Sequence, residues 1–227
     1  MEENSVITKN EALKRRSFLR YAGAGAALAT LTIAGCNKDD DMPRHEDGEY
    51  FGSGDIAILN YAYALEQLEA AFYTKVADAP YSGISALEKS YFIDIRDHEI
   101  AHREFFKTAI GGSAIKSLEV DFSSVNFGSR DSVLATAKAF EDLGVSAYNG
   151  AGRLIKDSKY LILAGQIVSV EARHAALIRD LISNGSFADD TVVDMNGLDT
   201  SRSPGEVLKI ASAYIKTKLN VKDLPNY

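Results

Sequence analysis

Residues 98–102 read His-Glu-Ile-Ala-His, and this stretch predicts metal chemistry in two incompatible ways. As His-x-x-x-His, His98 and His102 stand four apart on one helical face and would bind zinc, with Glu99 as the general base of a hydrolytic site. As Glu-x-x-His, Glu99 and His102 are themselves both ligands and make up half of a dinuclear site between helices. The two interpretations need different partners elsewhere in the chain.

A second Glu-x-x-His motif favours the dinuclear interpretation. Residues 170–174 read Val-Glu-Ala-Arg-His, so Glu171 and His174 repeat the pair while valine takes the place of the first histidine. A mononuclear zinc site does not account for such a repeat, whereas a dinuclear site needs two half-sites. The repeat therefore predicts that both Glu-x-x-His pairs contribute to one site.

Each Glu-x-x-His motif follows a stretch that carries a glutamate and a tyrosine seven residues apart. Residues 64–73 align without gaps over residues 139–148, and alanine, glutamate, leucine and tyrosine coincide. Residues seven apart on a helix point in nearly the same direction. The chain is thus predicted to contain two helical hairpins of similar plan. The paired glutamates and tyrosines are Glu66, Tyr73, Glu141 and Tyr148.

Packed around a pseudo-twofold axis, the hairpins would bring four carboxylates and two imidazoles together. Burying these carboxylates without counter-charge would cost several kcal/mol per ion, whereas two divalent cations offset their charge. Oxygen-rich ligation with little nitrogen suits iron or manganese better than a structural zinc. We therefore expect two iron ions, or manganese in place of iron. The expected ligands are Glu66, Glu99, His102, Glu141, Glu171 and His174.

Glu69 leaves one ligand position open. It lies one helical turn from Glu66 and would replace or supplement it as the ligand from the first helix. The residue that aligns with Glu69 in the other hairpin is Gly144, so the repeat does not decide between the two glutamates.

The spacing of apolar residues predicts four long helices. Asp55 is the expected N-cap of the first and Ser85 of the second. Residues 113–130 lack helical periodicity and are predicted to form a long, partly extended crossover, which a bundle needs when its second and third helices run parallel. No β-pattern is expected outside this crossover. The expected helices cover residues 55–77, 85–111, 131–155 and 158–184.

The 227-residue chain is 46% hydrophobic, which is enough for one domain with a full core. We assign residues 1–35 to a signal peptide, 36–54 to an acidic flexible tether, 55–185 to the bundle, and 186–227 to a C-terminal extension with one short helix. The chain carries a net charge of −7, and because residues 1–35 contribute +2, the remainder carries −9. Such an acidic protein has no electrostatic footprint for nucleic acid.

The N-terminus resembles a lipoprotein export signal. Arg15 and Arg16 open a stretch that resembles the twin-arginine signal, and the apolar run 21–34 that follows is too short to span a bilayer. Residues 33–36, Ile-Ala-Gly-Cys, resemble a bacterial lipobox, which implies lipidation of Cys36, the only cysteine of the chain. The acidic run after this cysteine resembles a signal that sends some bacterial lipoproteins to the cell surface. We expect an extracytoplasmic protein, lipid-anchored to the bacterial outer membrane or cell surface.

Residues 55 to about 184 resemble the ferritin-like superfamily of di-iron carboxylate proteins. Residues 59–73 are similar to the ferritin-like domain of bacterial desiccation-related proteins. The resemblance implies an all-α, up-down-down-up four-helix bundle with a long crossover between its second and third helices. It also implies the six ligands named above, with Tyr73 and Tyr148 beside the metal ions as donors of a hydrogen bond or an electron.

The resemblance implies oxidation of ferrous iron, detoxification of peroxide or dioxygen, or both, as stress protection at the cell envelope. A non-catalytic bundle with a structural or vestigial metal site is the alternative, and a zinc metalloprotease built on residues 98–102 is a distant one. The expected partners are metal ions, peroxide or dioxygen, and the membrane through the lipid anchor. A homodimer stays open.

Overall fold

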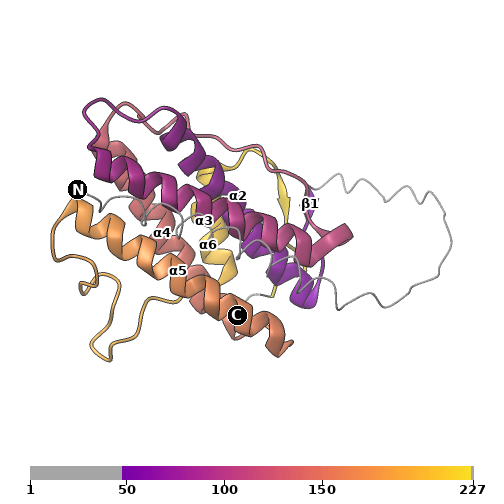
Figure 1. Cartoon of the computed structure of the whole chain (residues 1–227). Helices are drawn as coiled ribbons and strands as arrows, with labels where there is room; N and C mark the ends of the chain where they lie inside the picture. The colour runs from indigo at the N-terminus through magenta and orange to yellow at the C-terminus, as the bar shows by residue number, and fades with distance from the viewer. Residues whose placement is uncertain (1–47, 226–227) are drawn as a thin grey trace, which may run out of the picture. The chain divides into compact units, whose positions relative to one another are not determined.

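The computed structural model describes residues 48–225, which form a bundle of four long helices and a short fifth helix (Figure 1). Two 3-10 turns, Gly111–Ser113 and Ser212–Tyr214, follow the second and the fifth of these helices. The prediction of an all-α bundle is confirmed. The helices are α2 (Gly54–Asp78), α3 (Ala86–Ile110), α4 (Arg130–Gly152), α5 (Ser158–Ile182) and α6 (Pro204–Ala211).

The connections set the topology of the bundle. Short loops make α2 with α3, and α4 with α5, the two closely packed pairs, while α2 meets α4 across the bundle. Residues 114–129 join α3 to α4 without helix, and the bridge between Val120 and Ile215 holds part of this crossover in an extended form. The predicted up-down-down-up arrangement with a long crossover is therefore confirmed.

Two polar side chains of α2 bind the crossover to the bundle. The buried Asn60 amide accepts a hydrogen bond from Ile115 N at 2.9 Å and donates to Ser113 O at 2.9 Å. Two helical turns further along α2, the side-chain oxygen of Gln67 accepts a hydrogen bond from Leu118 N at 2.8 Å. These bonds satisfy backbone groups that the crossover would otherwise bury unpaired. In the middle of α2, every residue from Ala57 to Ala70 is buried, the polar ones included.

A capping side chain explains the start of α3 but not that of α2. Ser85 caps α3 as predicted, because its side chain accepts a hydrogen bond from Glu88 N. The prediction that Asp55 caps α2 is wrong, since Ser53 is the N-cap there. The Asp55 carboxylate instead accepts hydrogen bonds from the backbone N–H groups of Lys156 and Asp157 at 2.9 and 2.8 Å. It thereby ties the start of α2 to the start of α5 and satisfies donors beside that helix end.

The segments that flank the bundle pack against it. β1 (Glu49–Tyr50) pairs in parallel with β2 (Leu219–Asn220), and the Phe51 side chain is fully buried. Residues 48–54, the end of the predicted tether, thus lie on the domain. The strand pair also corrects the expectation of no β-structure outside the crossover, since two residues give no periodicity to detect. The predicted signal peptide and Cys36 lie outside the described residues.

Among the described helices, α5 is the only one long and apolar enough to cross a membrane, with a mean hydropathy of 1.4 over its best window. In the bundle, α5 turns Glu171 and His174 inward, where both are buried. Its outer face leaves Leu161 and Ile162 exposed at 45% and 63%. We therefore treat α5 as the fourth helix of the bundle.

Candidate metal centre

The six predicted ligands lie near the midpoints of the four long helices and point into the bundle. Glu66 comes from α2 and Glu141 from α4, while α3 and α5 each supply one Glu-x-x-His pair. Midpoints lie as far from the solvent-exposed helix ends as the fold allows. None of the six residues is more than 8% exposed.

The ligand atoms form two overlapping groups. One group contains Glu66 and His102, the other contains Glu141 and His174, and both contain Glu99 and Glu171. Within each group the ligand atoms lie within 4.8 Å of one another. Two cations in these groups would therefore share two carboxylates, and each would keep one glutamate and one histidine of its own. We call these places the His102 position and the His174 position.

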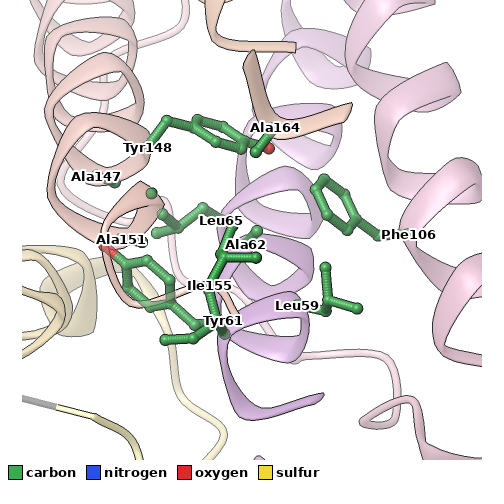
Figure 2. Close-up of a pocket in the computed structure, with 12 residues that line it drawn as sticks. Leu59, Tyr61, Ala62, Leu65, Phe106, Ala147, Tyr148, Ala151, Ile155 and Ala164 are labelled. Carbon is green, nitrogen blue, oxygen red and sulfur yellow. The ribbon is translucent and has the colours of Figure 1, made fainter. Parts of the chain in front are cut away.

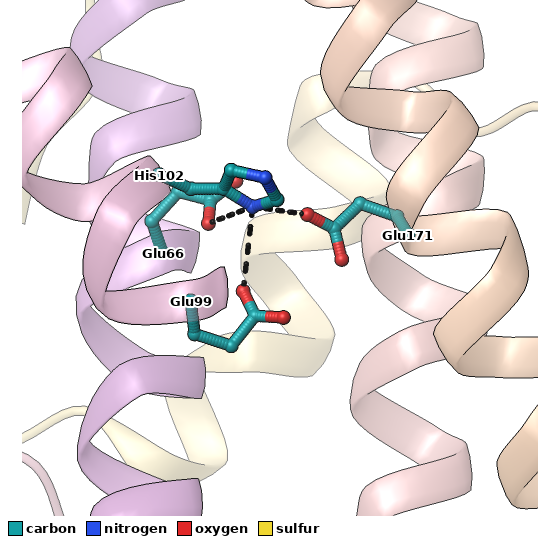
Figure 3. Close-up of side chains that lie close together, drawn as sticks. All are labelled: Glu66, Glu99, His102 and Glu171. Carbon is teal, nitrogen blue, oxygen red and sulfur yellow. Dashed lines mark ion pairs between the residues drawn. The ribbon is translucent and has the colours of Figure 1, made fainter. Parts of the chain in front are cut away.

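The imidazole of His102 faces three carboxylates from three different helices (Figure 3). Its Nδ1 atom lies 2.7 Å from Glu171 Oε1, 3.4 Å from Glu66 Oε2 and 3.8 Å from Glu99 Oε2. Convergence of one nitrogen and three oxygens on a small volume is what a cation requires.

The other half of the site repeats this geometry. The Nδ1 atom of His174 also faces three carboxylates, one of them on its own helix. The repeat follows from the pseudo-twofold relation between the two hairpins. The three distances are 2.9 Å to Glu99 Oε1, 3.2 Å to Glu171 Oε2 and 3.6 Å to Glu141 Oε2.

Unpaired buried atoms show that this donor set fits metal ions. Among the described side chains, six buried atoms of the predicted ligands make no well-aligned hydrogen bond, although several of them approach one another as ion pairs. Such atoms cost free energy unless something accepts their lone pairs. A divalent cation at each position would accept them, so the residues fit a dinuclear centre. The atoms are Glu66 Oε2, both carboxylate oxygens of Glu99, Glu141 Oε2, Glu171 Oε1 and His102 Nδ1.

Proton affinities in the site are strongly shifted. Burial, with the nearby charge of Glu171, raises the pKa of Glu99 to about 8. Burial opposes a charge on His174, but the surrounding carboxylates outweigh it and raise the pKa of this imidazole to about 12; the pKa of His102 is raised for the same reason. Burial likewise opposes the Glu171 carboxylate, but the two imidazoles lower its pKa to about 2. Without metal, protons on the imidazoles thus supply positive charge that two cations would replace.

Two tyrosines connect the hairpins at the ligands. Tyr73 of α2 donates a hydrogen bond to Glu141 Oε1 on α4 at 2.5 Å, and Tyr148 of α4 donates one to Glu66 Oε1 on α2. Burial raises the pKa of both phenols well above its usual range, so each keeps its proton. Each tyrosine occupies one oxygen of its glutamate and leaves Oε2 for the site. Each tyrosine therefore lies beside a glutamate of the candidate site.

Glu69 belongs to neither ligand group. Its buried carboxyl group lies against Gly144 of α4, with Oε1 only 3.0 Å from where a Cβ atom of residue 144 would stand. Burial and the neighbouring carboxylates raise its pKa well above the usual range, so Glu69 is a neutral acid. The structure thus places Glu66, and not Glu69, among the ligand atoms. Gly144 leaves room for this carboxyl group, but the contact joins α2 to α4 and the alignment of the repeat does not show it.

We expect Glu69→Gln to leave the metal content unchanged, because the amide keeps the shape and the neutral charge of the protonated acid. Glu66→Gln is the matched variant on the same helix, and it should remove the ion at the His102 position. Elemental analysis of both purified variants checks this. A loss of metal in Glu69→Gln equal to that in Glu66→Gln would show that Glu69 is a ligand.

His98 lies outside both ligand groups. Its Nδ1 atom is 2.9 Å from Nε2 of His174, the ring nitrogen that faces away from the carboxylates. The structure therefore does not bring His98 and His102 together on one ion, as the zinc interpretation of residues 98–102 requires. Sequence reasoning missed the contact between His98 and His174, since the two residues are far apart in the chain.

A small apolar cavity is lined by residues of all four long helices (Figure 2). Tyr148 lines it, and so do Ala62 and Phe106, which stand one helical turn from Glu66 and His102 respectively. Its volume is about 20 Å³, and a cavity of roughly 10–15 Å³ already holds one water-sized molecule. With so apolar a lining, a small neutral molecule fits it better than an ion. The alanines on its wall are the only sequence signal, and in a helix they look like ordinary core residues.

Comparison with known proteins agrees with this geometry. The ferritin-like domain family matches residues 54–184, more than half of the chain. The match begins with α2, ends just after α5 and includes all six predicted ligands. No curated protein matches the chain. The matched range and the buried cluster of glutamate and histidine place this chain in the ferritin-like domain family.

Proposed function

We propose that the chain binds two divalent transition metal ions, iron or manganese, and uses them to oxidise ferrous iron with peroxide or dioxygen as the electron acceptor. The observation that carries this proposal is the pair of ligand groups that share Glu99 and Glu171. When bound, two adjacent redox-active ions supply two-electron chemistry. Two ferrous ions give the two electrons that reduce one peroxide, with two protons, to two water molecules.

The residues of the chain have separate tasks in this proposal. Glu66 and Glu141 would each hold one ion through Oε2, while Tyr148 and Tyr73 donate a hydrogen bond to the other oxygen of those carboxylates. These hydrogen bonds fix the direction in which each carboxylate offers its free oxygen. Burial of all six ligands excludes bulk water, and the cavity beside Tyr148 gives a small neutral oxidant a place next to the site.

We expect iron-loaded protein to oxidise added ferrous ion in the presence of peroxide much faster than a Glu99→Ala, Glu171→Ala double variant. The double variant lacks both shared carboxylates, so neither position keeps its ligand set. Glu104 is an exposed glutamate of α3, the helix that carries Glu99, so Glu104→Ala is the control and should behave as wild type. The measurement is the initial rate at which ferric absorbance increases, compared between proteins that are folded to the same extent. Equal rates in wild type and double variant, with metal present in the wild type, would favour a non-catalytic, metal-stabilised bundle.

We also propose that the protein acts in stress protection at the cell envelope, held there by a lipid on Cys36. Support comes from the lipobox-like residues 33–36 and the twin-arginine-like pair Arg15 and Arg16. Cys36→Ala should release the protein from the membrane fraction, and Arg15→Lys with Arg16→Lys should block export. Cell fractionation checks both. A Cys36→Ala protein that stays in the membrane fraction would disprove the lipid anchor.

A further inference from the structure

We infer that His98 positions His174, so that the His174 position binds a divalent cation more tightly than the His102 position. This inference rests on the proposed dinuclear site and adds that its two halves differ in their affinity for a cation. It concerns a residue that belongs to neither ligand group.

The contact between His98 and His174 has the geometry of an in-plane hydrogen bond. The facing nitrogens are 2.9 Å apart, the ring planes differ by 9°, and the ring centroids are 5.2 Å apart. Because the centroid distance exceeds the nitrogen distance by roughly one ring width, the rings lie edge to edge and do not stack. The N–H of one ring therefore points along the lone pair of the other.

Which of the two rings donates this hydrogen bond follows from the contacts of the other ring nitrogen of His174. Its Nδ1 atom faces the carboxylates, at 2.9 Å from Glu99 Oε1, and is the nitrogen that would hold an ion. A neutral imidazole that binds metal through Nδ1 carries its proton on Nε2. That N–H then donates to Nδ1 of His98. The bond fixes both the tautomer and the rotation of the ligand, as outer partners of metal-bound histidines do.

The half of the site that contains His102 lacks a histidine equivalent to His98. The pseudo-twofold relation that superposes one Glu-x-x-His pair on the other places Val170 at the position equivalent to His98. Valine cannot accept a hydrogen bond, so the part of the chain that the structure describes offers His102 no equivalent imidazole. His102 is also the more exposed of the two histidines, at 8% against 4% for His174. The fold thus makes two similar positions, and a hydrogen bond to a histidine outside the ligand groups orients the histidine ligand of only one of them.

A purely structural role for His98 makes a different prediction. His98 belongs to α3 and His174 to α5, so their bond also joins the two hairpins. If joining them were its only task, removing His98 would weaken the metal-free fold and affect both metal positions alike. If His98 positions His174, its removal weakens one position alone, by roughly 10–100-fold in affinity.

Anaerobic titration of the full folded domain with Mn²⁺, followed calorimetrically, separates these roles. We expect two affinity classes in the wild type, assigned by Glu141→Gln, which disables the His174 position, and Glu66→Gln, which disables the His102 position. His98→Val should weaken only the tighter class, by roughly 10–100-fold. His98→Asn, whose side-chain oxygen lies close to where Nδ1 stood, should restore most of it. Val170→Ala is the matched control and should change neither class.

Three outcomes would overturn the inference. Two ions bound with equal affinity by the wild type would remove the inequality, and the proposed dinuclear site would still stand. Equal weakening of both classes by His98→Val, together with a lower melting temperature of the metal-free protein, would make His98 a structural link between helices. Binding of no more than one Mn²⁺ by the wild type would overturn the proposed function as well.

Discussion

Glu171→Gln is expected to abolish the binding of both metal ions and to destabilise the metal-free protein by about 3–5 kcal/mol. Glu171 is shared by the two ligand groups, so its loss disables both positions. It also lies 2.7 Å from His102 Nδ1 and 3.2 Å from His174 Nδ1. In the metal-free state these imidazoles are cationic, and removing the carboxylate leaves them buried with less counter-charge. Metal analysis and denaturant unfolding at pH 7 measure the two effects.

Glu99→Gln is the matched variant, and it separates metal binding from stability. Glu99 is the other shared carboxylate, so its replacement should also abolish the binding of both ions. Burial raises the pKa of Glu99 to about 8, and the acid is therefore mostly neutral at pH 7. A neutral amide in its place should leave the metal-free protein as stable as wild type or more stable. Equal destabilisation by both variants would contradict the proposed arrangement of protons, and two ions retained in either would contradict the shared roles.

The metal-free protein is expected to lose stability as the pH rises from about 5 to about 8. The folded pKa of Glu99 is raised to about 8, so the folded state binds more protons than the unfolded state across this window. The pKa of His174 is raised to about 12, and its contribution is complete below the usual histidine pKa and fades as the pH rises further. The lowered pKa of Glu171 acts with the opposite sign, but only under more acidic conditions.

Bound metal ions should reverse this dependence of stability on pH. Ligands must lose their protons to bind a cation, so the affinity rises with pH, and the stabilisation by a saturating ion rises with it. Melting temperatures measured across the window in chelator and in excess Mn²⁺ should therefore diverge as the pH increases. Glu99→Gln should flatten the curve measured in chelator. A metal-free melting temperature that rises through this window would show that the site does not hold the protons described above.

The helices and the clustering of the candidate ligands were predictable because both depend on local spacing. Helical periodicity gave the bounds of α2 to α5 to within about three residues, the usual limit for helix ends. A separation of three residues fixes Glu99 and His102 on one face of α3, whatever packs against it. The second Glu-x-x-His pair and the glutamates before each pair then define the site by repetition.

Features that depend on contacts between distant segments were not predictable. No spacing rule places His98 of α3 beside His174 of α5. Asp55 has the sequence context of an N-cap, yet its carboxylate binds backbone donors about a hundred residues further along the chain. Glu69 and Glu66 lie one turn apart on α2, and only the packing of α4 decides which of them enters the site.

Anomalous diffraction from crystals grown with Mn²⁺ tests the dinuclear site most directly. We expect two anomalous peaks per chain, both in contact with Glu99 and Glu171. One peak should also contact Glu66 and His102, and the other the remaining two ligands of the site. A single peak held by His98 and His102, or no peak within reach of Glu171, would contradict the dinuclear site.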